Sequence, residues 1–342
     1  MAAREGRGFA FARRAKGPSL VSDGKSFRYT CIVLLGSRLL PEAAQRFLFQ
    51  GESAREFCKQ TSAETAGCHG TGDCALYTWA SAELGVLGET GASKKLREAV
   101  VRDRALTTVD AAWSISALAA SLTAGAGHDE LRIAFERLVA GYSRPGKLFR
   151  HWTSADAAPW YRSHVGCFAD QIYSIQALSR YYSATGDTVA LEIAAECADQ
   201  IVRLQGPEGQ WWWHYDVRQG SVIEGYPVYT VHQDSMAPMG LFELYEAGGP
   251  DHRSAIDLGL RWLEEKQETE SSLVKEDSML IWRSVRRSDP AKTVRRVRAV
   301  VSYFLPSARL GFLDAAFPPG QVDHEDRPYH LGWILYAWLG QS

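Results

Sequence analysis

The chain of 342 residues is 46% hydrophobic and 23% charged, and its 38 basic and 40 acidic side chains leave a formal net charge of −2. This composition excludes a disordered, fibrous or low-complexity protein, and the near-neutral charge implies no partner selected by overall charge. Aromatic residues are numerous, with 11 Trp, 14 Tyr and 13 Phe. Such side chains fill cores, stack on sugar rings or line carbocation pockets.

The beginning of the chain predicts an extension and no membrane anchor. Residues 1–26 contain many basic residues and glycines, so we expect a flexible basic arm ahead of a single domain over residues 27–342. The most apolar early run, residues 31–35, is far shorter than the roughly 20 apolar residues that a membrane span needs. Six cysteines without a C-x-x-C pair indicate reduced thiols and a cytoplasmic location.

Helix signals dominate the rest of the chain and recur in pairs. In each pair the first helix is uncharged and rich in small residues, and the second is amphipathic with a charged face. The pairs cover residues 73–87 and 94–105, 110–123 and 129–140, 170–185 and 187–205, and 233–247 and 251–267. Further helices are predicted at residues 275–287, 290–305 and 329–339.

The contrast between the two helices of a pair predicts the architecture. A helix without a charged face must be buried on most sides, whereas an amphipathic helix covers it from outside. About six such hairpins predict an all-α fold, an (α/α) toroid or barrel with long loops at its rim. An open solenoid is the alternative, but solenoids usually show more regular repeats.

In this pattern the sequence resembles the α/α-toroid superfamily. The stretch ALSRYYSATGDTVALEIAAECADQI, residues 177–201, has the order of inner helix, Gly-Asp turn and outer helix that is typical of the superfamily. Its members include six-hairpin glycosidases, N-acylglucosamine 2-epimerase-like enzymes, glycan epimerases and lyases, terpenoid cyclases and lanthionine cyclases. The resemblance implies a site on the rim where the inner helices begin, but no particular chemistry.

A long loop, residues 205–239, carries the densest group of candidate site residues. Polar-tipped aromatic and ionisable residues in such a loop favour a binding rim on a rigid scaffold, although a β-hairpin flap that caps the toroid is the alternative. The catalytic candidates are His232, Asp234, Glu224 and Tyr226, and the substrate-binding candidates are Trp211, Trp212, Trp213 and Tyr229.

Ionisable residues at helix entrances are the candidates for acid-base chemistry. His232 is the first choice, because the helix dipole can tune its pKa there. Asp234 could instead cap the helix. Asp73, Asp110 and Asp170 lie at or just ahead of the starts of other inner helices. Together they would put several carboxylates on one rim, which suits hydrolysis or proton transfer at a sugar carbon.

Two further segments are expected at the same rim. The loop WYRSHVG contributes Trp160, Arg162 and His164, and the segment DHEDRPYHLGW contributes Arg327, Tyr329 and His330. Closure of the ring would bring the second segment near Arg28 and Tyr29. Arg with Tyr and His suits uronic-acid chemistry, in which Arg neutralises the carboxylate and Tyr or His moves the C5 proton. The alternative is a helix N-terminus whose acidic residues complement the dipole.

Motifs for metal and isoprenoid chemistry are incomplete. GCHGTGDC resembles the Cys-His-Gly-Thr turn of lanthionine cyclases and offers Cys68 and His69 to Zn²⁺, but the companion turn with the third ligand is missing. QGPEGQW matches the repeat of squalene-hopene-type cyclases once, without a D-x-D-D acid motif. A DDxxD cluster for diphosphate-bound Mg²⁺ is also missing. We expect neither a metal nor another cofactor.

Residues 283–298 form a strongly basic stretch. They hold Arg283, Arg286, Arg287, Lys292, Arg295, Arg296 and Arg298 against one acidic residue. This stretch is either the solvated face of an outer helix or a contact surface for a polyanion. A nucleic acid is not expected, since no recognised reading module is present.

The sequence therefore favours a cytoplasmic carbohydrate-active enzyme: an epimerase, lyase or hydrolase of an acidic or amino-sugar glycan or its precursor. A terpenoid cyclase-like enzyme with an aromatic-lined cavity is one alternative. A non-catalytic accessory protein that binds a glycan or a partner is the other. A polar cavity with several carboxylates and a His favours the sugar hypothesis, and an apolar cavity with a lone acid favours the isoprenoid one.

Overall fold

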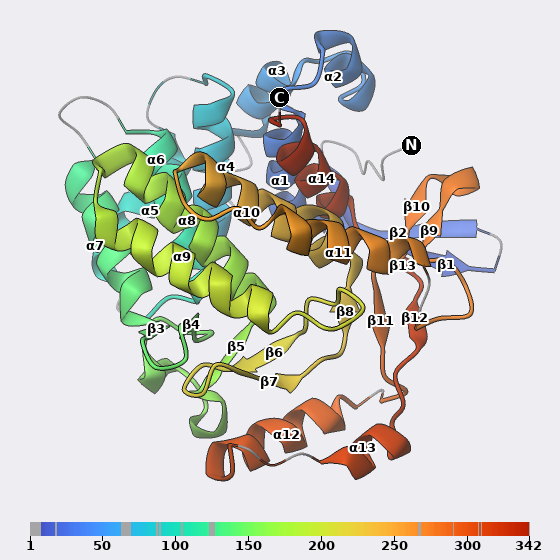
Figure 1. Cartoon of the computed structure of the whole chain (residues 1–342). Coiled ribbons are helices and arrows are strands. Elements are labelled where there is room, and N and C mark those ends of the chain that lie inside the picture. The colour runs from blue at the N-terminus through green and yellow to red at the C-terminus, as the bar shows by residue number, and fades with distance from the viewer. Residues whose placement is uncertain are drawn as a thin grey trace.

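Helices make up most of the structure, and several short sheets join them (Figure 1). The computed structural model describes residues 8–17, 19–62, 70–86, 88, 90–103, 105–122, 127–265, 268–289, 291–306, 308 and 310–341. Within these ranges, none of the helices combines the length and the apolar character needed to span a bilayer. The expected all-α class is correct for the bulk of the chain and wrong for the short sheets.

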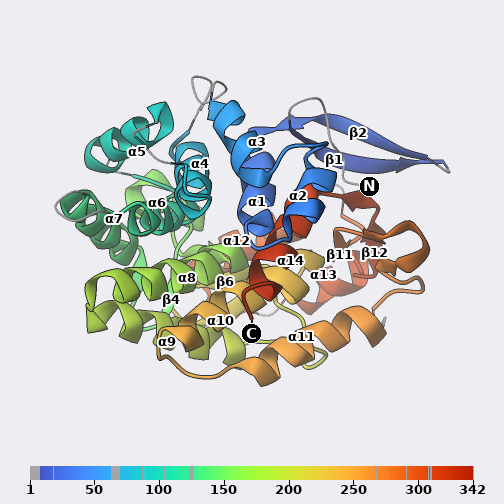
Figure 2. The ribbon, with the colours of Figure 1, turned by 90° about the horizontal axis from the view of Figure 1, so that it is seen from above.

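Six of the described helices contact one another in a closed series. They are α1 (Phe27–Ser37), α4 (Thr71–Glu83), α6 (Thr108–Ala120), α8 (Phe168–Thr185), α10 (Ala237–Glu246) and α14 (Pro328–Trp338). Each contacts the next, and α14 contacts both α10 and α1, which closes the series (Figure 2). These inner helices carry few charges because neighbours enclose them; in α4, for example, residues 74–81 are all buried.

Amphipathic helices cover this inner ring from outside. They are α5 (Gly91–Arg102), α7 (His128–Ala140), α9 (Thr188–Arg203) and α11 (Arg253–Glu265), and each packs on the inner helix that precedes it (Figure 2). In α9, Ile193, Cys197 and Ile201 repeat at helical spacing on the buried face. The four predicted helix pairs are thus confirmed, with shifts of a few residues at their ends. Two short helices, α2 (Glu42–Leu48) and α3 (Ala54–Thr61), follow α1.

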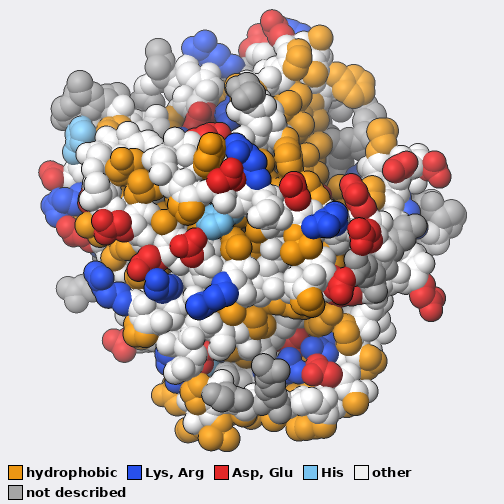
Figure 3. All heavy atoms as spheres, in the orientation of Figure 1, with side chains coloured by type: hydrophobic (Ala, Val, Ile, Leu, Met, Phe, Trp, Pro, Cys, Tyr) orange, Lys and Arg blue, Asp and Glu red, His pale blue; other side chains and the backbone are white. Residues whose placement is uncertain are grey.

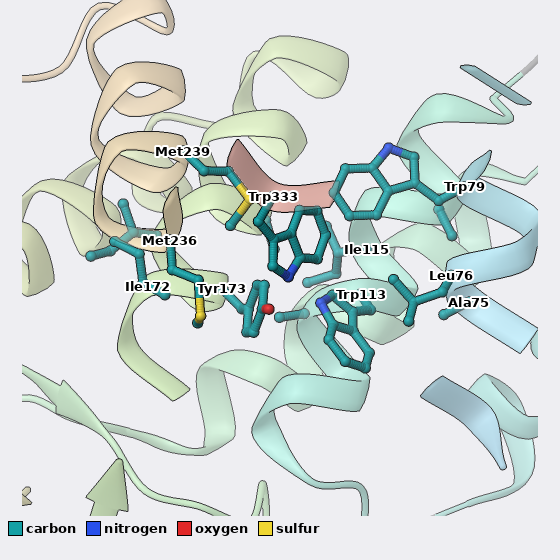
Figure 4. Packing of buried hydrophobic residues seen from close by; sticks show 14 of the residues in the cluster. Ala75, Leu76, Trp79, Trp113, Ile115, Ile172, Tyr173, Met236, Met239 and Trp333 are labelled. Carbon is teal, nitrogen blue, oxygen red and sulfur yellow. The ribbon is translucent and has the colours of Figure 1, made fainter. Parts of the chain in front are cut away.

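Large aromatic side chains fill the space inside the inner ring (Figure 4). The ring centroids of Trp79 and Trp333 lie 6.0 Å apart, those of Tyr173 and Trp333 5.8 Å, and those of Trp113 and Tyr173 5.1 Å. These residues come from α4, α14, α8 and α6, so one aromatic cluster joins four inner helices. The burial of such large apolar surfaces stabilises the ring as a unit.

The ring closes where α1 meets α14, and this contact depends on glycine. A Cβ atom at Gly36 of α1 would lie 2.1 Å from the carbonyl oxygen of Gly332 in α14. Two glycines therefore let the first and last inner helices approach backbone to backbone. The helix α1 was missing from the sequence prediction, and with it this seam.

The residues expected to form a flexible arm form a hairpin over their described part. Strands β1 (Phe9–Lys16) and β2 (Ser19–Ser26) pair with each other, and β1 also pairs with β13 (Glu325–Asp326). Phe9 is buried, Phe11 stacks on Tyr29 at 5.6 Å, and Arg13 pairs with Asp326. The arm prediction was wrong because these long-range contacts order a segment that looks unstructured by composition.

Short strands line one end of the ring. One sheet joins β5 (Val165–Cys167), β6 (His214–Asp216) and β7 (Ser221–Glu224); another joins β12 (Gln321–Asp323), β11 (Ser284–Arg286) and β8 (Val228–Tyr229). Two further hairpins are formed by β3 (Tyr142–Ser143) with β4 (Leu148–Phe149) and by β9 (Val274–Lys275) with β10 (Leu280–Ile281). The helix predicted at 275–287 was wrong: Leu280, Trp282 and Ser284 are buried in alternation, which is the period of a strand.

The basic stretch forms part of a separate helical layer. The helices α12 (Thr293–Phe304) and α13 (Gly311–Ala316) lie beyond the sheets at the lower end of Figure 1. There α12 contacts β7 and the short 3₁₀ helix Trp160–Arg162. It is therefore not an outer helix of a hairpin. Figure 3 shows apolar side chains at this lower end, and Phe304 and Phe312 are 65% and 68% exposed.

Candidate active site

Three carboxylates lie in the first turns of successive inner helices. Asp73 belongs to α4, Asp110 to α6 and Asp170 to α8. Arg28 in the first turn of α1 contacts two of them: its Nε lies 2.9 Å from Asp73 Oδ1, and its Nη2 lies 3.9 Å from Asp110 Oδ1. The expected acidic rim is therefore present, with an arginine between two of its members.

Asp110 is half-buried beside Arg28. Burial raises its pKa, although Arg28 and a hydrogen bond at Thr107 oppose this shift. A Cβ atom at Gly72 would lie 2.0 Å from Asp110 Oδ1, so the glycine leaves room for the carboxylate beside α4. The Arg28 guanidinium lies 5.1 Å from the ring of Trp113, which is a cation–π contact.

Asp170 is fully buried and pairs with a histidine that the sequence analysis missed. Its Oδ2 accepts the backbone N–H of Cys167 at 2.7 Å, and both of its oxygens lie 3.2 Å from His151 Nδ1. The charge of Asp170 and its hydrogen bond raise the pKa of His151, while burial and Arg162 oppose the shift. The side chain of His151 is 42% exposed, so this His-Asp pair reaches solvent.

Within the described residues, one group of three donor side chains could hold a metal ion, and it includes this His-Asp pair. Donor atoms of His151, Cys167 and Asp170 all lie within 4.8 Å of one another. Burial raises the pKa of the Cys167 thiol well above its usual value, which disfavours the thiolate that a metal requires. The donor set therefore fits a His-carboxylate pair better than a metal centre. Cys68 and His69, weighed above as zinc ligands, lie outside the described residues.

Two predicted residues close the rim on its other side. Arg327 Nη1 donates to Tyr29 Oη at 2.6 Å, and the rings of Tyr29 and Tyr329 lie 4.6 Å apart. Burial raises the pKa of Tyr173, and the neighbouring Tyr329 adds to this shift. The expectation that the C-terminal cluster meets Tyr29 is confirmed, whereas the contacts of Arg28 are with Asp73, Asp110 and Trp113.

The three tryptophans of the long loop point in different directions. Trp211 is fully buried and packs on Phe168, with ring centroids 5.4 Å apart. Trp212 packs edge-on against Tyr226, and Trp213 lies 4.9 Å from the ring of Tyr229. Of the three, Trp211 belongs to the core, while Trp212 and Trp213 are half-buried.

His232, the first choice for acid-base chemistry, is enclosed by aromatic rings. It lies in the single-turn π-helix His232–Met236 ahead of α10, with Phe168 at 4.6 Å and Trp213 stacked at 5.9 Å. Burial lowers its pKa to about 3, and its Nδ1 has no hydrogen-bond partner in the described part of the chain. A histidine in this environment is neutral near pH 7, which favours a packing role.

Asp234, in the π-helix ahead of α10, and His330, in α14, form a buried pair. The Nε2 of His330 lies 2.7 Å from Asp234 Oδ1, and the Asp234 carbonyl accepts the indole N–H of Trp338. The two residues thus join neighbouring inner helices. The structure brings Asp234 to His330, and within the described residues no hydrogen bond or ion pair joins it to His151 or Asp170.

Glu224 and Tyr226 hold α12 and a surface loop in place. Glu224 is 1% exposed and lies 3.0 Å from Arg287 and 3.2 Å from Arg298. The Tyr226 hydroxyl donates to Glu268 at 2.9 Å. Both candidates for catalysis therefore pair with residues outside the long loop 205–239.

The loop WYRSHVG contacts α12. Trp160 is 56% exposed and lies 5.2 Å from the ring of Tyr303. His164 Nε2 lies 2.8 Å from Ser302 Oγ, and burial lowers its pKa to about 4. Arg162 is half-buried, and its charge acts on His151. Of the three, Arg162 is the one near the acidic rim.

A cavity of about 310 Å³, here named the arginine-lined cavity, opens beside Tyr229. It lies between β8, β11, β12 and the start of α12. Its charged lining consists of Arg14, Arg283, Arg286, Arg287, Lys292, Arg295 and Arg327 with Glu224, Asp289, Asp323 and Glu325. The basic stretch thus faces a concave site with part of its length. Three of its members, Arg283, Arg287 and Arg298, form ion pairs with acidic residues.

Comparison with known proteins adds the fold family. No model of a known protein family matches the sequence, and no curated protein matches it significantly. An unsaturated glucuronyl hydrolase specific for heparin is similar with a TM-score of 0.60 at 12% identity, over 96% of this chain and 89% of that chain. A variant unsaturated glucuronyl hydrolase from Streptococcus agalactiae, complexed with dGlcA-GalNAc6S, has a TM-score of 0.57 at 13% identity, over 94% and 81%.

A third similar structure is a possible member of the GH105 family from Salmonella enterica, with a TM-score of 0.58 at 7% identity, over 96% of this chain and 87% of that chain. None of these three proteins is described as an epimerase, a lyase or a terpenoid cyclase. Similarity at such low identity establishes the fold and leaves the activity open. The chain therefore has the same fold as the unsaturated glucuronyl hydrolases and the possible GH105 member.

Proposed function

We propose that this protein is a glycoside hydrolase that releases a glucuronyl residue, in its unsaturated form, from an acidic glycan, and that its inner ring is an (α/α) toroid. The observation that carries the proposal is the placement of Asp110 and Asp170 at the starts of adjacent inner helices. One carboxylate is held beside Arg28 and the other beside His151. Two carboxylates on one rim are the groups that glycoside hydrolysis uses.

The similar structures support this choice of carboxylates. The Streptococcus agalactiae enzyme was also studied with either of two aspartates replaced by asparagine. Those two aspartates are as far apart along their chain as Asp110 and Asp170 are along this one. A correspondence in both spacing and residue type favours these two over Asp73.

The environments of the two carboxylates suggest different roles. The raised pKa of Asp110 lets its carboxyl keep a proton at a higher pH than an ordinary aspartate, which suits a general acid. Asp170 accepts the Cys167 amide and lies beside His151, which fixes its orientation. In the proposed reaction it takes a proton from an attacking water. Trp113 and Tyr173 offer aromatic faces for the sugar rings.

Incubation with an unsaturated glucuronyl disaccharide tests the proposal directly. We expect release of the two sugars, followed by chromatography with mass detection, and no release from the corresponding glucosyl disaccharide. Binding of the acidic disaccharide without turnover would favour the accessory protein. Thermal stabilisation by prenyl diphosphates alone would favour the terpenoid cyclase hypothesis.

A further inference from the structure

The arginine-lined cavity carries more positive than negative side chains. Seven basic and four acidic residues line it. The acidic residues are already engaged: Glu224 lies 3.0 Å from Arg287, and Glu325 lies 3.0 Å from Arg14 and 3.3 Å from Arg283. The cavity therefore keeps a surplus of positive charge after these pairs are formed.

The remaining acidic residues form no ion pair with Arg295 in the described part of the chain, although the charge of Asp289 acts on it. Asp323 lies 3.5 Å from Arg283, and Asp289 accepts the backbone N–H of Val294 at 2.7 Å. In the part of the chain that the structure describes, the guanidinium of Arg295 forms neither an ion pair nor a hydrogen bond. Arg295 is nevertheless half-buried, and burial lowers its pKa. A half-buried guanidinium without an acidic partner is unfavourable until an anion binds it.

Tyr229 offers a hydrogen-bond donor at the same cavity. Its ring is held by Trp213 at 4.9 Å and His232 at 5.0 Å, and the guanidinium of Arg283 lies 5.1 Å from its centroid. Its hydroxyl makes no hydrogen bond to any described residue. The charge of Arg295 acts on this hydroxyl, which places the two groups near each other.

Arg162 lies on a short 3₁₀ helix that contacts α12, the helix that carries Arg295. The charges of Arg162 and Arg295 both act on His214, and that of Arg162 also acts on His151. Arg162 also has no ion pair with a described carboxylate. The mouth of the ring is thus acidic at the starts of α4, α6 and α8 and basic toward α12.

We infer that Arg295 and the Tyr229 hydroxyl, which both line the arginine-lined cavity, form a subsite for an oxyanion carried by a sugar, either a carboxylate or a sulfate. The inference rests on the proposed function and names the group that positions the substrate. An acidic sugar held by this basic wall presents its glycosidic bond toward Asp110 and Asp170. Arginine with a tyrosine hydroxyl supplies the charge-assisted hydrogen bonds that carboxylates and sulfates accept.

Binding measurements test the subsite without turnover. Thermal unfolding of the full chain is followed with glucuronate, glucose 6-sulfate or glucose, for the wild type and for the variants Arg295→Gln and Arg296→Gln. Arg296 is the next residue of α12 and is exposed, so its variant is the matched control. We expect glucuronate or the sulfate to raise the Tm of the wild type and the control. We expect no rise for Arg295→Gln, and none with glucose for any of the three.

The two anions distinguish a subsite for a carboxylate from a subsite for a sulfate. A shift with glucuronate alone identifies a carboxylate subsite, and a shift with glucose 6-sulfate alone identifies a sulfate subsite. Equal shifts in the wild type and Arg295→Gln, or shifts of equal size with glucose, would overturn the inference. The inference would also be overturned if neither anion raised the Tm of the wild type.

Kinetics separate this inference from the proposed hydrolysis. On the unsaturated glucuronyl disaccharide we expect Arg295→Gln to raise KM at least about tenfold, the loss of one hydrogen bond to a charged group, with kcat changed little. Arg295→Lys should recover part of the affinity, since it keeps the charge without the planar fork. An inactive wild type that still binds glucuronate through Arg295 would refute the hydrolase and leave the subsite standing.

Discussion

Replacement of Glu224 by Gln separates a structural from a catalytic role for this residue. Glu224 is 1% exposed, and its two arginine partners, Arg287 and Arg298, are 8% and 16% exposed. Removal of one partner of a buried ion pair costs about 3–5 kcal/mol. Both arginines keep a second contact to Asp314, at 2.7 and 2.8 Å, so the lower end of this range applies.

The loss in stability converts into a measurable shift. With an unfolding entropy of about 2.1 cal/mol/K per residue, a chain of this length loses about 4 °C in Tm for about 3 kcal/mol. Because Arg298 lies in α12, the amides of this helix should also exchange faster with solvent. We expect Glu224→Gln to show both effects, by calorimetry and by hydrogen exchange, with kcat within about tenfold of the wild type.

A matched control uses an acidic residue without these partners. Glu192 is exposed on α9, and Glu192→Gln should leave both Tm and α12 exchange unchanged. If Glu224→Gln keeps the wild-type Tm and loses about a hundredfold or more in kcat, Glu224 is catalytic and the assignment as an anchor of α12 is refuted.

Three further predictions address other parts of the molecule. His232→Phe keeps the aromatic packing and removes an unpartnered nitrogen, so the pH profile of kcat/KM should not move; a lost limb would restore His232 as the acid or base. The raised pKa of His151 means that its pair with Asp170 stabilises the fold at low pH and is lost as the pH rises through that pKa, so His151→Gln should flatten the dependence of Tm on pH above about 6.5; an unchanged dependence would contradict the pair. Gly36→Ala forces a Cβ against the facing helix and should cost about 1–3 kcal/mol in chemical denaturation, whereas Gly311→Ala, with open space around it, should cost little; equal effects would contradict the tight seam.

The helix pairs could be predicted because their signal is local. Ile193, Cys197 and Ile201 bury one face of α9, and charges occupy the other, so the sequence shows both the period and the buried side. The turn at Gly186 and Asp187 marks the boundary for the same reason, since the glycine adopts a φ of 74° and the aspartate caps the next helix.

The sheets and the hairpin at the beginning of the chain could not be predicted, because the contacts that define them join residues far apart in the sequence. Strand β11 spans only Ser284–Arg286 and is defined by its partners β8 and β12, which lie far away in sequence. A strand of this length shows too few residues for a period to be recognised. Its basic residues were therefore read as part of a helical run.

The candidate site was predicted in part for a similar reason. The carboxylates at helix entrances were recognisable, because an inner helix and its first turn are local features. His151 lies in a loop, and no local pattern indicates that it meets Asp170. Conversely, the histidine with the most suggestive position, His232, is enclosed by Phe168 and Trp213, which only the packing reveals.

The rate of hydrolysis by carboxylate variants tests the central claim most directly. Release of sugar from an unsaturated glucuronyl disaccharide is measured for the wild type, Asp110→Asn, Asp170→Asn and the control Asp156→Asn, whose side chain is exposed. We predict a loss of about 10²–10⁴ in kcat for Asp110→Asn and Asp170→Asn, with folded protein in each case and an unchanged control. Wild-type rates in both rim variants would contradict the assignment of the active site.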